Sequence, residues 1–359
     1  MTNTGKGGRR ARAPFEIEGE SIPPGTHRSL TLDLPGMSQH TPLSMPVHVV
    51  HGRKDGPVLW VSAAIHGDEI NGIDIIRQLL RMKTLGRLRG TLICIPVVNV
   101  HGFYNHERYL PDRRDLNRAF PGSEHGSLAS RMAYTFRTRI VDRADVGIDL
   151  HTGSNHRTNL PHIRANMDDA DAARLARAFG APVVVDAKLR DGSLRGYANE
   201  RQIPTLLYEA GESLRFDPLA IRGGVRGVLN VMVELDMLPR SRGPRGRHHA
   251  PIEARSSHWL RAPQTGILRP SVQPGTRVQP GDTLAHLGDL MGSGDVTMEA
   301  VREGVVIGQN LMPMVNEGDA CFHIAEFSNA ARAERSVETF SETLEGLGEG
   351  DYPDSGFPD

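Results

Sequence analysis

The middle of the chain alternates between short, continuously apolar runs and longer runs in which apolar residues recur at helical spacing. "PVLWVSAAI" (57–65) and "GTLICIPVVNV" (90–100) are typical of buried strands, whereas "EINGIDIIRQLLRMKTLG" (69–86) has the period of an amphipathic helix. The alternation continues to residue 238. It predicts an α/β fold with a mostly parallel mixed sheet and helices on both of its faces.

The two ends of the chain and one internal segment lack this pattern. The N-terminus is rich in Gly, Arg and Pro, the segment "LPRSRGPRGRHHAPIEARS" has no periodicity, and the end of the chain is acidic and rich in Ser and Gly, with one weak helix at most. We therefore expect five parts: a disordered N-terminus (1–25), an α/β domain (26–240), a linker (241–258), a small all-β module (259–327) and an acidic tail (328–359).

The predicted β module contains one pattern twice. "GILRPSVQPGTRVQPGD" and "GVVIGQNLMPMVNEGD" both begin with glycine and a β-branched residue, and both end in Gly-Asp. Such a duplication of short strands predicts a small sandwich or barrel. It resembles the biotinyl/lipoyl-carrier fold, in which a lysine carries the cofactor. Because residues 261–326 contain no lysine, we do not expect a carrier function.

Composition narrows the class of protein. The 42 Lys and Arg residues balance 43 Asp and Glu residues, which gives a formal net charge of -1 and argues against binding to nucleic acid or to a membrane surface. The N-terminal basic segment is not followed by the apolar stretch of a secretory signal. The two cysteines lie in apolar contexts. We expect a cytoplasmic protein, and a homo-oligomer is compatible with the sequence.

The first candidate for chemistry is the pair His66 and Glu69 in "AAIHGDEINGIDII". The pair follows a buried strand, so it lies at the carboxyl end of the sheet, where ligands of open α/β sheets bind. Gly67 would let the backbone turn tightly beside a ligand. The alternative is an ordinary start of a helix, which also favours acidic residues.

A second strand, "GIDLHTGS", would bring His151 to the same edge of the sheet. Two histidines and one glutamate, with an open position for water, form a catalytic zinc site in other proteins. His66, Glu69 and His151 are therefore our candidate ligands for one Zn²⁺. Asp149 lies on the same face of the strand as His151 and would either hold a ligand imidazole or form an unrelated ion pair.

The candidate general base is Glu209, at the end of the apolar strand "TLLYEAGES". A buried carboxylate is costly unless a metal, a cation or solvent is near, and hydrolysis at a zinc site needs a base. Glu212 lies beyond the strand and is the weaker candidate. The alternative for Glu209 is an ion pair at the end of the strand.

The loop "RYLPDRRDLNRAFPG" supplies candidates for substrate binding. Asn117 and Arg118 would hold a carboxylate, since a guanidinium binds one through two parallel hydrogen bonds. Arg108 would face the developing oxyanion, although Arg113 and Arg114 compete for this position.

The motifs "HGDE", "RYLPDRRDLNRAFPG", "DLHTG" and "YEAGE" occur in this order, and the sequence resembles the succinylglutamate desuccinylase/aspartoacylase family. The resemblance implies a zinc carboxypeptidase-like fold and hydrolysis of the amide bond of a small N-acyl amino acid or related acylated amine. By matching motif, His66, Glu69 and His151 would bind zinc, and Glu209 would activate water at the metal. Asn117 and Arg118 would hold the substrate carboxylate, and Arg108 the scissile carbonyl.

Among bacterial members, the sequence is similar to the N-acetyl-diaminobutyrate deacetylases of ectoine breakdown, which makes that amide one candidate substrate. Three alternatives stay open. The protein would be a zinc carboxypeptidase that acts on peptides, a catalytically silent binding protein on the same scaffold, or a two-metal aminopeptidase. The last would need further ligands, for which Asp68, His101 and His156 are candidates without paired spacing.

Overall fold

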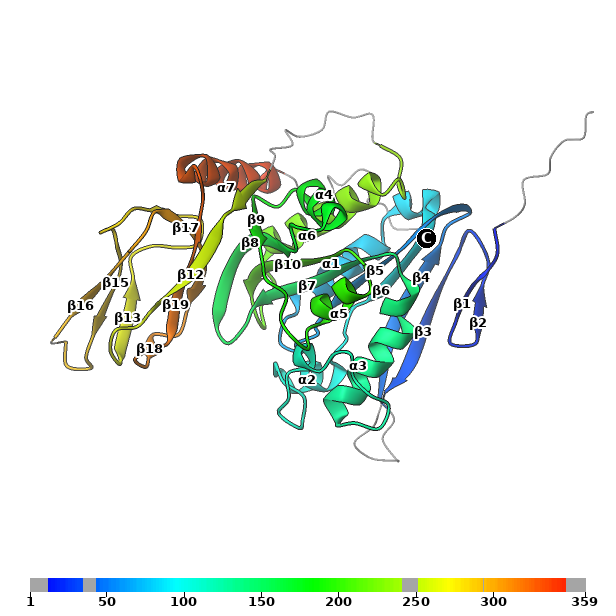
Figure 1. Cartoon of the computed structure of the whole chain (residues 1–359), viewed down its shortest axis with the longest axis horizontal. Helices are drawn as coiled ribbons and strands as arrows, with labels where there is room; N and C mark the ends of the chain where they lie inside the picture. The colour runs from blue at the N-terminus through cyan, green and yellow to red at the C-terminus, as the bar shows by residue number, and fades with distance from the viewer. Residues whose placement is uncertain (1–11, 35–42, 241–250, 293, 347–359) are drawn as a thin grey trace, which may run out of the picture.

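The structure is a computed structural model that describes residues 12–34, 43–240, 251–292 and 294–346 (Figure 1). A large mixed sheet carries helices on both faces, and an all-β region follows toward the C-terminus. The predicted fold class is therefore confirmed. Within these four ranges, no helix combines the length and the apolar character that a membrane span requires.

Four parallel strands form the centre of the sheet, in the spatial order β10-β7-β5-β6. Along β5, Leu59 and Val61 enter one hydrophobic core and Trp60 enters the other. Since side chains of a strand point alternately to the two faces, a strand that is buried on both is expected to be mostly apolar. The central strands are β5 (Lys54–Ala63), β6 (Arg89–Ile95), β7 (Val146–Gly153) and β10 (Thr205–Glu212).

Helices fill the two cores from opposite sides. The core around Leu59 contains Ile75, Leu175 and Val225 of three helices, which are α1 (Asn71–Leu80), α4 (Ala170–Phe179) and α6 (Pro218–Glu234). The core around Trp60 receives side chains from α2 (Val100–Asn105), α3 (Leu128–Arg139) and α5 (Leu194–Glu200). Three 3₁₀ turns complete this part, η1 (Lys83–Arg87), η2 (Leu116–Arg118) and η3 (Val141–Arg143).

The outer strands of the sheet pair mostly in antiparallel fashion. On one side β4 pairs with β6, and β3 with β4; on the other side β8 pairs with β10. Strand β9 lies parallel to both β8 and β11. The bounds are β3 (Thr26–Leu34), β4 (Leu43–His51), β8 (Arg157–Ala165), β9 (Val183–Asp186) and β11 (Ile252–Ala254). Strand β8 and helices α2 and α5 were not expected from the sequence.

The prediction of a disordered N-terminus is wrong for residues 12–25, and residues 1–11 lie outside the described ranges. A hairpin of β1 (Phe15–Ile17) and β2 (Glu20–Ile22) packs against the α/β body. Ile17 and Ile22 are buried in the core around Trp60. The burial of these two side chains offsets the conformational entropy of ordering a polar segment.

The C-terminal β region (residues 256–326) is joined to the main sheet. Its own sheet has the order β16-β15-β13-β18, but β17 pairs with β8, and β19 and β12 follow outward (Figure 1). The strands are β12 (Ser256–Arg261), β13 (Gly266–Pro270), β14 (Arg277–Val278), β15 (Thr283–Gly288), β16 (Val296–Glu299), β17 (Gly304–Asn310), β18 (Met314–Val315) and β19 (Ala320–Glu326).

The linker predicted over residues 241–258 ends earlier than expected, because regular strands begin at Ile252. Residues 241–250 lie outside the described ranges, but 252–254 and 256–258 belong to β11 and β12, because β11 finds a parallel partner in β9. In the acidic tail, helix α7 (Ala330–Glu345) packs against α6 and buries Val337 and Leu344. The division of the chain into domains otherwise stays a prediction.

Candidate metal and active site

The turn after β5 holds His66 and Glu69 in a fixed arrangement. The Glu69 amide donates to the His66 carbonyl at 3.1 Å, and α1 begins only at Asn71, so Glu69 precedes the helix. A Cβ at Gly67 would come within 2.2 Å of the backbone of Gly102 and Phe103. Glycine is therefore required here by close approach of the next loop, as well as by the tightness of the turn.

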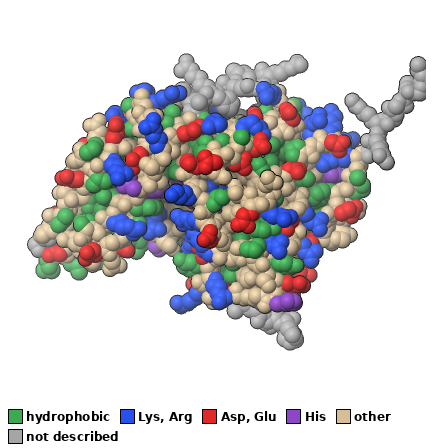
Figure 2. Space-filling model, viewed as in Figure 1, with side chains coloured by type: hydrophobic (Ala, Val, Ile, Leu, Met, Phe, Trp, Pro, Cys, Tyr) green, Lys and Arg blue, Asp and Glu red, His purple; other side chains and the backbone are tan. Residues whose placement is uncertain are grey.

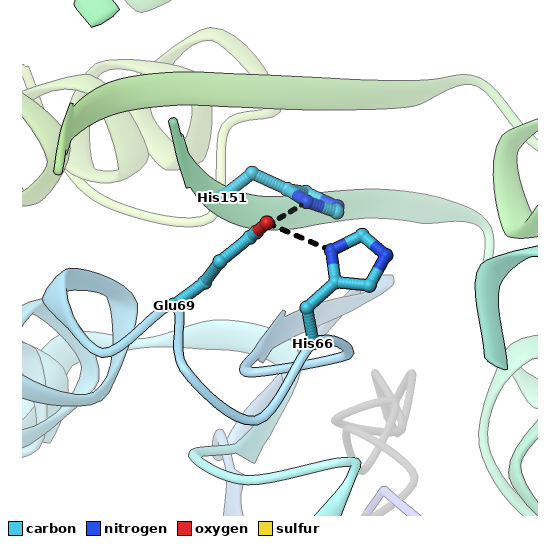
Figure 3. A group of neighbouring side chains, drawn as sticks. All are labelled: His66, Glu69 and His151. Carbon is cyan, nitrogen blue, oxygen red and sulfur yellow. Dashed lines mark hydrogen bonds and ion pairs between the residues drawn. The ribbon is translucent and has the colours of Figure 1, made fainter. Parts of the chain in front are cut away.

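Three ligand atoms from His66, Glu69 and His151 lie within 4.8 Å of one another, and all three residues are buried (Figure 3). Nδ1 of His66 is 2.9 Å from Glu69 Oε1, and Nδ1 of His151 is 2.7 Å from Glu69 Oε2. In the sequence, His151 is more than eighty positions from His66 and Glu69. The parallel pairing of β5 with β7 brings them together at the carboxyl end of the sheet.

Each imidazole is oriented by a carboxylate on its far side. Nε2 of His66 donates to Asp115 at 3.1 Å, and Nε2 of His151 donates to Asp149 at 2.7 Å. Asp149 is itself held by the Ser62 hydroxyl, which donates at 2.7 Å. Of the two roles considered for Asp149, the structure shows a contact with a candidate ligand imidazole, that of His151.

The charges of this cluster depend on one another. Burial alone would lower the pKa of both histidines, but Glu69 with Asp115 or Asp149 raises the pKa of His66 and, strongly, that of His151. Burial would raise the pKa of Glu69, and the two imidazoles instead hold it well below its usual range. Both Nδ1 atoms face Glu69, so the two imidazoles and the carboxylate together offer donor atoms for a divalent cation. This donor set, with the far nitrogens tied to carboxylates, fits Zn²⁺.

Glu209 lies beside His151, its register partner on the neighbouring parallel strand. Burial raises the pKa of Glu209, while His151 and Arg164 oppose this shift. Asn159 Nδ2 donates to Glu209 Oε2 at 2.9 Å. Glu212 instead pairs with the exposed Arg215 at 3.1 Å and does not line the cavity.

Of the three arginines considered for the oxyanion, Arg108 reaches the site. Its Nη1 is 3.0 Å from Glu69 Oε1, and its Nη2 is 3.1 Å from Asp115 Oδ2. Arg113 and Arg114 are exposed and do not line the cavity. Arg108 therefore also braces a candidate ligand, which the sequence did not indicate.

Asn117 and Arg118 lie side by side on the wall of the cavity. The Oδ1 atom of Asn117 accepts from the Leu194 amide at 2.8 Å, which fixes the orientation of the side-chain amide. Arg118 donates to the carbonyl of Asn117 through Nη1, and its guanidinium has no carboxylate partner within the described residues.

A cavity of about 430 Å³ joins these groups, within the usual size of a small-molecule site. Figure 2 shows Lys and Arg side chains where the C-terminal β region meets the α/β body. Seven of the lining residues are arginines, against three carboxylates, Glu69, Glu209 and Asp319. Of these seven arginines, Arg108 alone forms an ion pair within the described ranges. The arginines are Arg108, Arg118, Arg157, Arg164, Arg190, Arg195 and Arg261.

Sequence reasoning missed two walls of this cavity. Strand β8 supplies Asn159, His162 and Arg164, and the C-terminal β region supplies Trp259 and His323, among others. The rings of Trp259 and His323 stack with centroids 4.6 Å apart. In "RTNLPHIRA", polar and apolar residues alternate only over residues 162–165, and the first three residues are all polar, so the period-2 signal of a strand is too short to identify β8.

The sequence model of the succinylglutamate desuccinylase/aspartoacylase catalytic domain matches residues 55–235. N-alpha-acetyl-L-2,4-diaminobutyric acid deacetylase of Halomonas elongata is 30% identical over 302 residues, which cover 79% of this chain and 85% of that protein. The chain belongs to the succinylglutamate desuccinylase/aspartoacylase family. The resemblance inferred from the four motifs is confirmed.

Solved structures have the same fold. A succinylglutamate desuccinylase/aspartoacylase from Rhodobacter sphaeroides aligns with a TM-score of 0.76 and 25% identity, over 84% of this chain and 95% of that one. The product-bound ectoine utilization protein EutE (DoeB) from Ruegeria pomeroyi aligns with a TM-score of 0.76 and 23% identity over the same shares. These alignments cover more of the chain than residues 55–235, which the catalytic-domain model matches.

Proposed function

We propose that the protein is a zinc-dependent deacylase that hydrolyses the amide bond of a small N-acyl amino acid or related acylated amine. The observation that carries this proposal is the position of Glu209 beside the cluster of His66, Glu69 and His151, in a cavity rich in arginine. The arrangement combines a cation site, a base and groups for a carboxylate. Membership of a family with a deacetylase relative supports the same reaction.

His66, Glu69 and His151 would hold one Zn²⁺, with Asp115 and Asp149 fixing the two imidazoles. Bound there, zinc supplies Lewis acidity toward the scissile carbonyl and makes water a nucleophile near neutral pH. Glu209 would accept the proton of the attacking water and return it to the departing amine. Its raised pKa brings the carboxyl closer to the pH at which both transfers are efficient.

Arg108 would stabilise the negative charge that develops on the carbonyl oxygen. Its guanidinium is mostly buried and is fixed by Glu69 and Asp115, so it needs no reorganisation during the reaction. Asn117 and Arg118 would bind the substrate carboxylate through the Nδ2 group and the guanidinium. The excess of arginines over carboxylates in the cavity favours an acidic substrate.

Our first candidate substrate is N-alpha-acetyl-L-2,4-diaminobutyric acid, after which the Halomonas elongata relative is named. Asn117 and Arg118 would also bind the C-terminal carboxylate of a peptide. A zinc carboxypeptidase is therefore the alternative that uses the same mechanism. The two-metal alternative finds no support: within the described residues, no further group of three potential ligands lies close together.

The test is a product-release assay with zinc-loaded enzyme on a panel of N-acyl amino acids that includes N-acetyl-diaminobutyrate, beside short peptides with a free C-terminus. We expect amine release from at least one N-acyl amino acid and loss of activity after chelation, with recovery on addition of zinc. Hydrolysis of peptides alone would favour the carboxypeptidase. Zinc-loaded enzyme that hydrolyses neither class would favour the silent binding protein.

A further inference from the structure

Glu209 is held by one neutral side chain from another strand. Asn159 on β8 donates from Nδ2 to Glu209 Oε2 at 2.9 Å. It is the only hydrogen bond to this carboxylate within the described residues, and it leaves Oε1 available. Asn159 and Glu209 both line the cavity and lie on adjacent antiparallel strands.

Asn159 is in turn confined by the C-terminal β region. Its register partner on β17 is Gly308. A Cβ added at Gly308 would lie 2.8 Å from Asn159 Oδ1 and 3.2 Å from the Cβ of His323. Any side chain at position 308 would therefore displace the amide that contacts Glu209, because the backbones of β8 and β17 are fixed by their pairing.

We propose that Asn159 is a positioning residue for Glu209 and that strand β17 sets the position of Asn159 through Gly308. This inference rests on the proposed function, in which Glu209 is the base. It gives the C-terminal β region a part in the chemistry: β17 supports the contact that orients the base.

The physical argument concerns the freedom of the Glu209 side chain. A glutamate has three side-chain torsions, and the hydrogen bond from Asn159 Nδ2 restricts them at the carboxylate of Glu209. A hydrogen bond to Oε2 fixes the carboxylate plane and aims Oε1 into the cavity, so the base is oriented before substrate binds. Loss of a contact that orients a metal ligand typically lowers activity about 10- to 100-fold, and we expect a loss of the same order for a contact that orients the base.

The first test is the variant Asn159→Ala, with Thr158→Ala as its matched control. Thr158 is the preceding residue on β8 and does not line the cavity. We expect kcat of Asn159→Ala to fall about tenfold or more with KM little changed, and zinc content and Tm to stay near those of Thr158→Ala. A crystal structure should show the Glu209 carboxylate in more than one orientation. Wild-type kcat in Asn159→Ala would overturn the inference.

A double-mutant cycle separates positioning from a general structural effect. If Asn159 acts through Glu209, adding Asn159→Ala to Glu209→Gln should change kcat less than about twofold. An additive loss of the full size would overturn the positioning role. The single variant Glu209→Gln tests the proposed function separately, because near wild-type turnover there would refute the base itself.

Gly308→Ala tests the link to β17. We expect a fall in kcat in the otherwise wild-type protein and no further fall in the Asn159→Ala background, where the added methyl group no longer meets the amide. If Gly308→Ala lowers kcat equally in both backgrounds, it acts through His323 or the backbone, and the proposed role of β17 is wrong. Wild-type kcat in the single variant would overturn that role as well.

Discussion

At the scale of single residues, the cluster around Glu69 is defined by which nitrogen each histidine turns inward. Both Nδ1 atoms face Glu69, and both Nε2 atoms donate to carboxylates. A divalent cation placed between the Nδ1 atoms and Glu69 would find the ligand orientations already fixed. Metal affinity should therefore depend on each of the three candidate ligands.

We predict that His151→Ala loses zinc. Two remaining ligands do not complete a site, so zinc after dialysis against a weak chelator should fall from about one ion per chain to near zero. Elemental analysis of the dialysed protein measures this. His156→Ala is the matched control, since His156 is exposed, close in sequence and absent from the cavity wall. Equal zinc content in both variants would refute the assignment.

We predict that Glu209→Gln keeps zinc and loses turnover. Glutamine preserves the shape of the side chain and can still accept from Asn159, but it cannot take a proton, so kcat should fall about 10²- to 10⁴-fold. Steady-state kinetics with the best substrate of the panel measures the loss. Glu212→Gln removes a nearby carboxylate that pairs with Arg215 and should retain turnover close to wild type.

At the scale of elements, strand β8 joins two halves of the site. It pairs with β10, which carries Glu209, and with β17 of the C-terminal β region. It also places a buried imidazole, His162, on the cavity wall. Burial lowers the pKa of His162 to about 3, although its Nδ1 donates to the Leu160 carbonyl at 2.7 Å. On β19, burial lowers the pKa of His323 to about 2.

These neutral histidines predict that acid destabilises the fold. Between the usual pKa of histidine, about 6.5, and about 3, the unfolded chain binds a proton at His162 that the folded chain does not. The contribution of the neutral His162 to the free energy of unfolding is therefore complete above pH 6.5 and decreases as the pH falls through this window. The free energy of unfolding, measured by urea titration at several pH values, should depend less on pH in His162→Gln than in the wild-type protein. The control His286→Gln removes an exposed imidazole and should keep the wild-type dependence on pH.

At the scale of the whole molecule, one sheet runs from the N-terminal strands into the C-terminal β region. Strands β17, β19 and β12 extend it beyond β8, and α7 packs across both parts through α6 and β17. The cavity takes its lining from both sides of this junction. An element that forms part of the same sheet and the same cavity should not open independently.

We therefore predict that the two parts unfold together. The chain has two tryptophans: Trp60 lies in the α/β core, and Trp259 lies on β12. In each single-tryptophan variant, Trp259→Phe and Trp60→Phe, the fluorescence transition in urea should coincide with the loss of secondary structure by circular dichroism. Separate midpoints in the Trp60→Phe variant would show that the C-terminal β region unfolds on its own.

The local pattern of apolar residues was sufficient to predict an element where its segment has one dominant period. The central strands are mostly apolar, apart from polar residues near their ends, because both faces are buried. The helices between them are amphipathic, so the α/β class followed from the sequence. Strand β8 contains Pro161 and several polar residues, and β1 and β2 have three residues each. Their stability comes from partners distant in the chain, which no local period records.

The sequence by itself determined the family, the fold class and the residue types of the candidate site, because four motifs carry them in order. Tertiary structure alone decided that Arg108 braces Glu69, that Asp115 and Asp149 orient the imidazoles, and that the C-terminal β region closes the cavity. The physical reason is that these facts are distances between side chains of different strands and loops. Such distances are set by the register and pairing of the sheet.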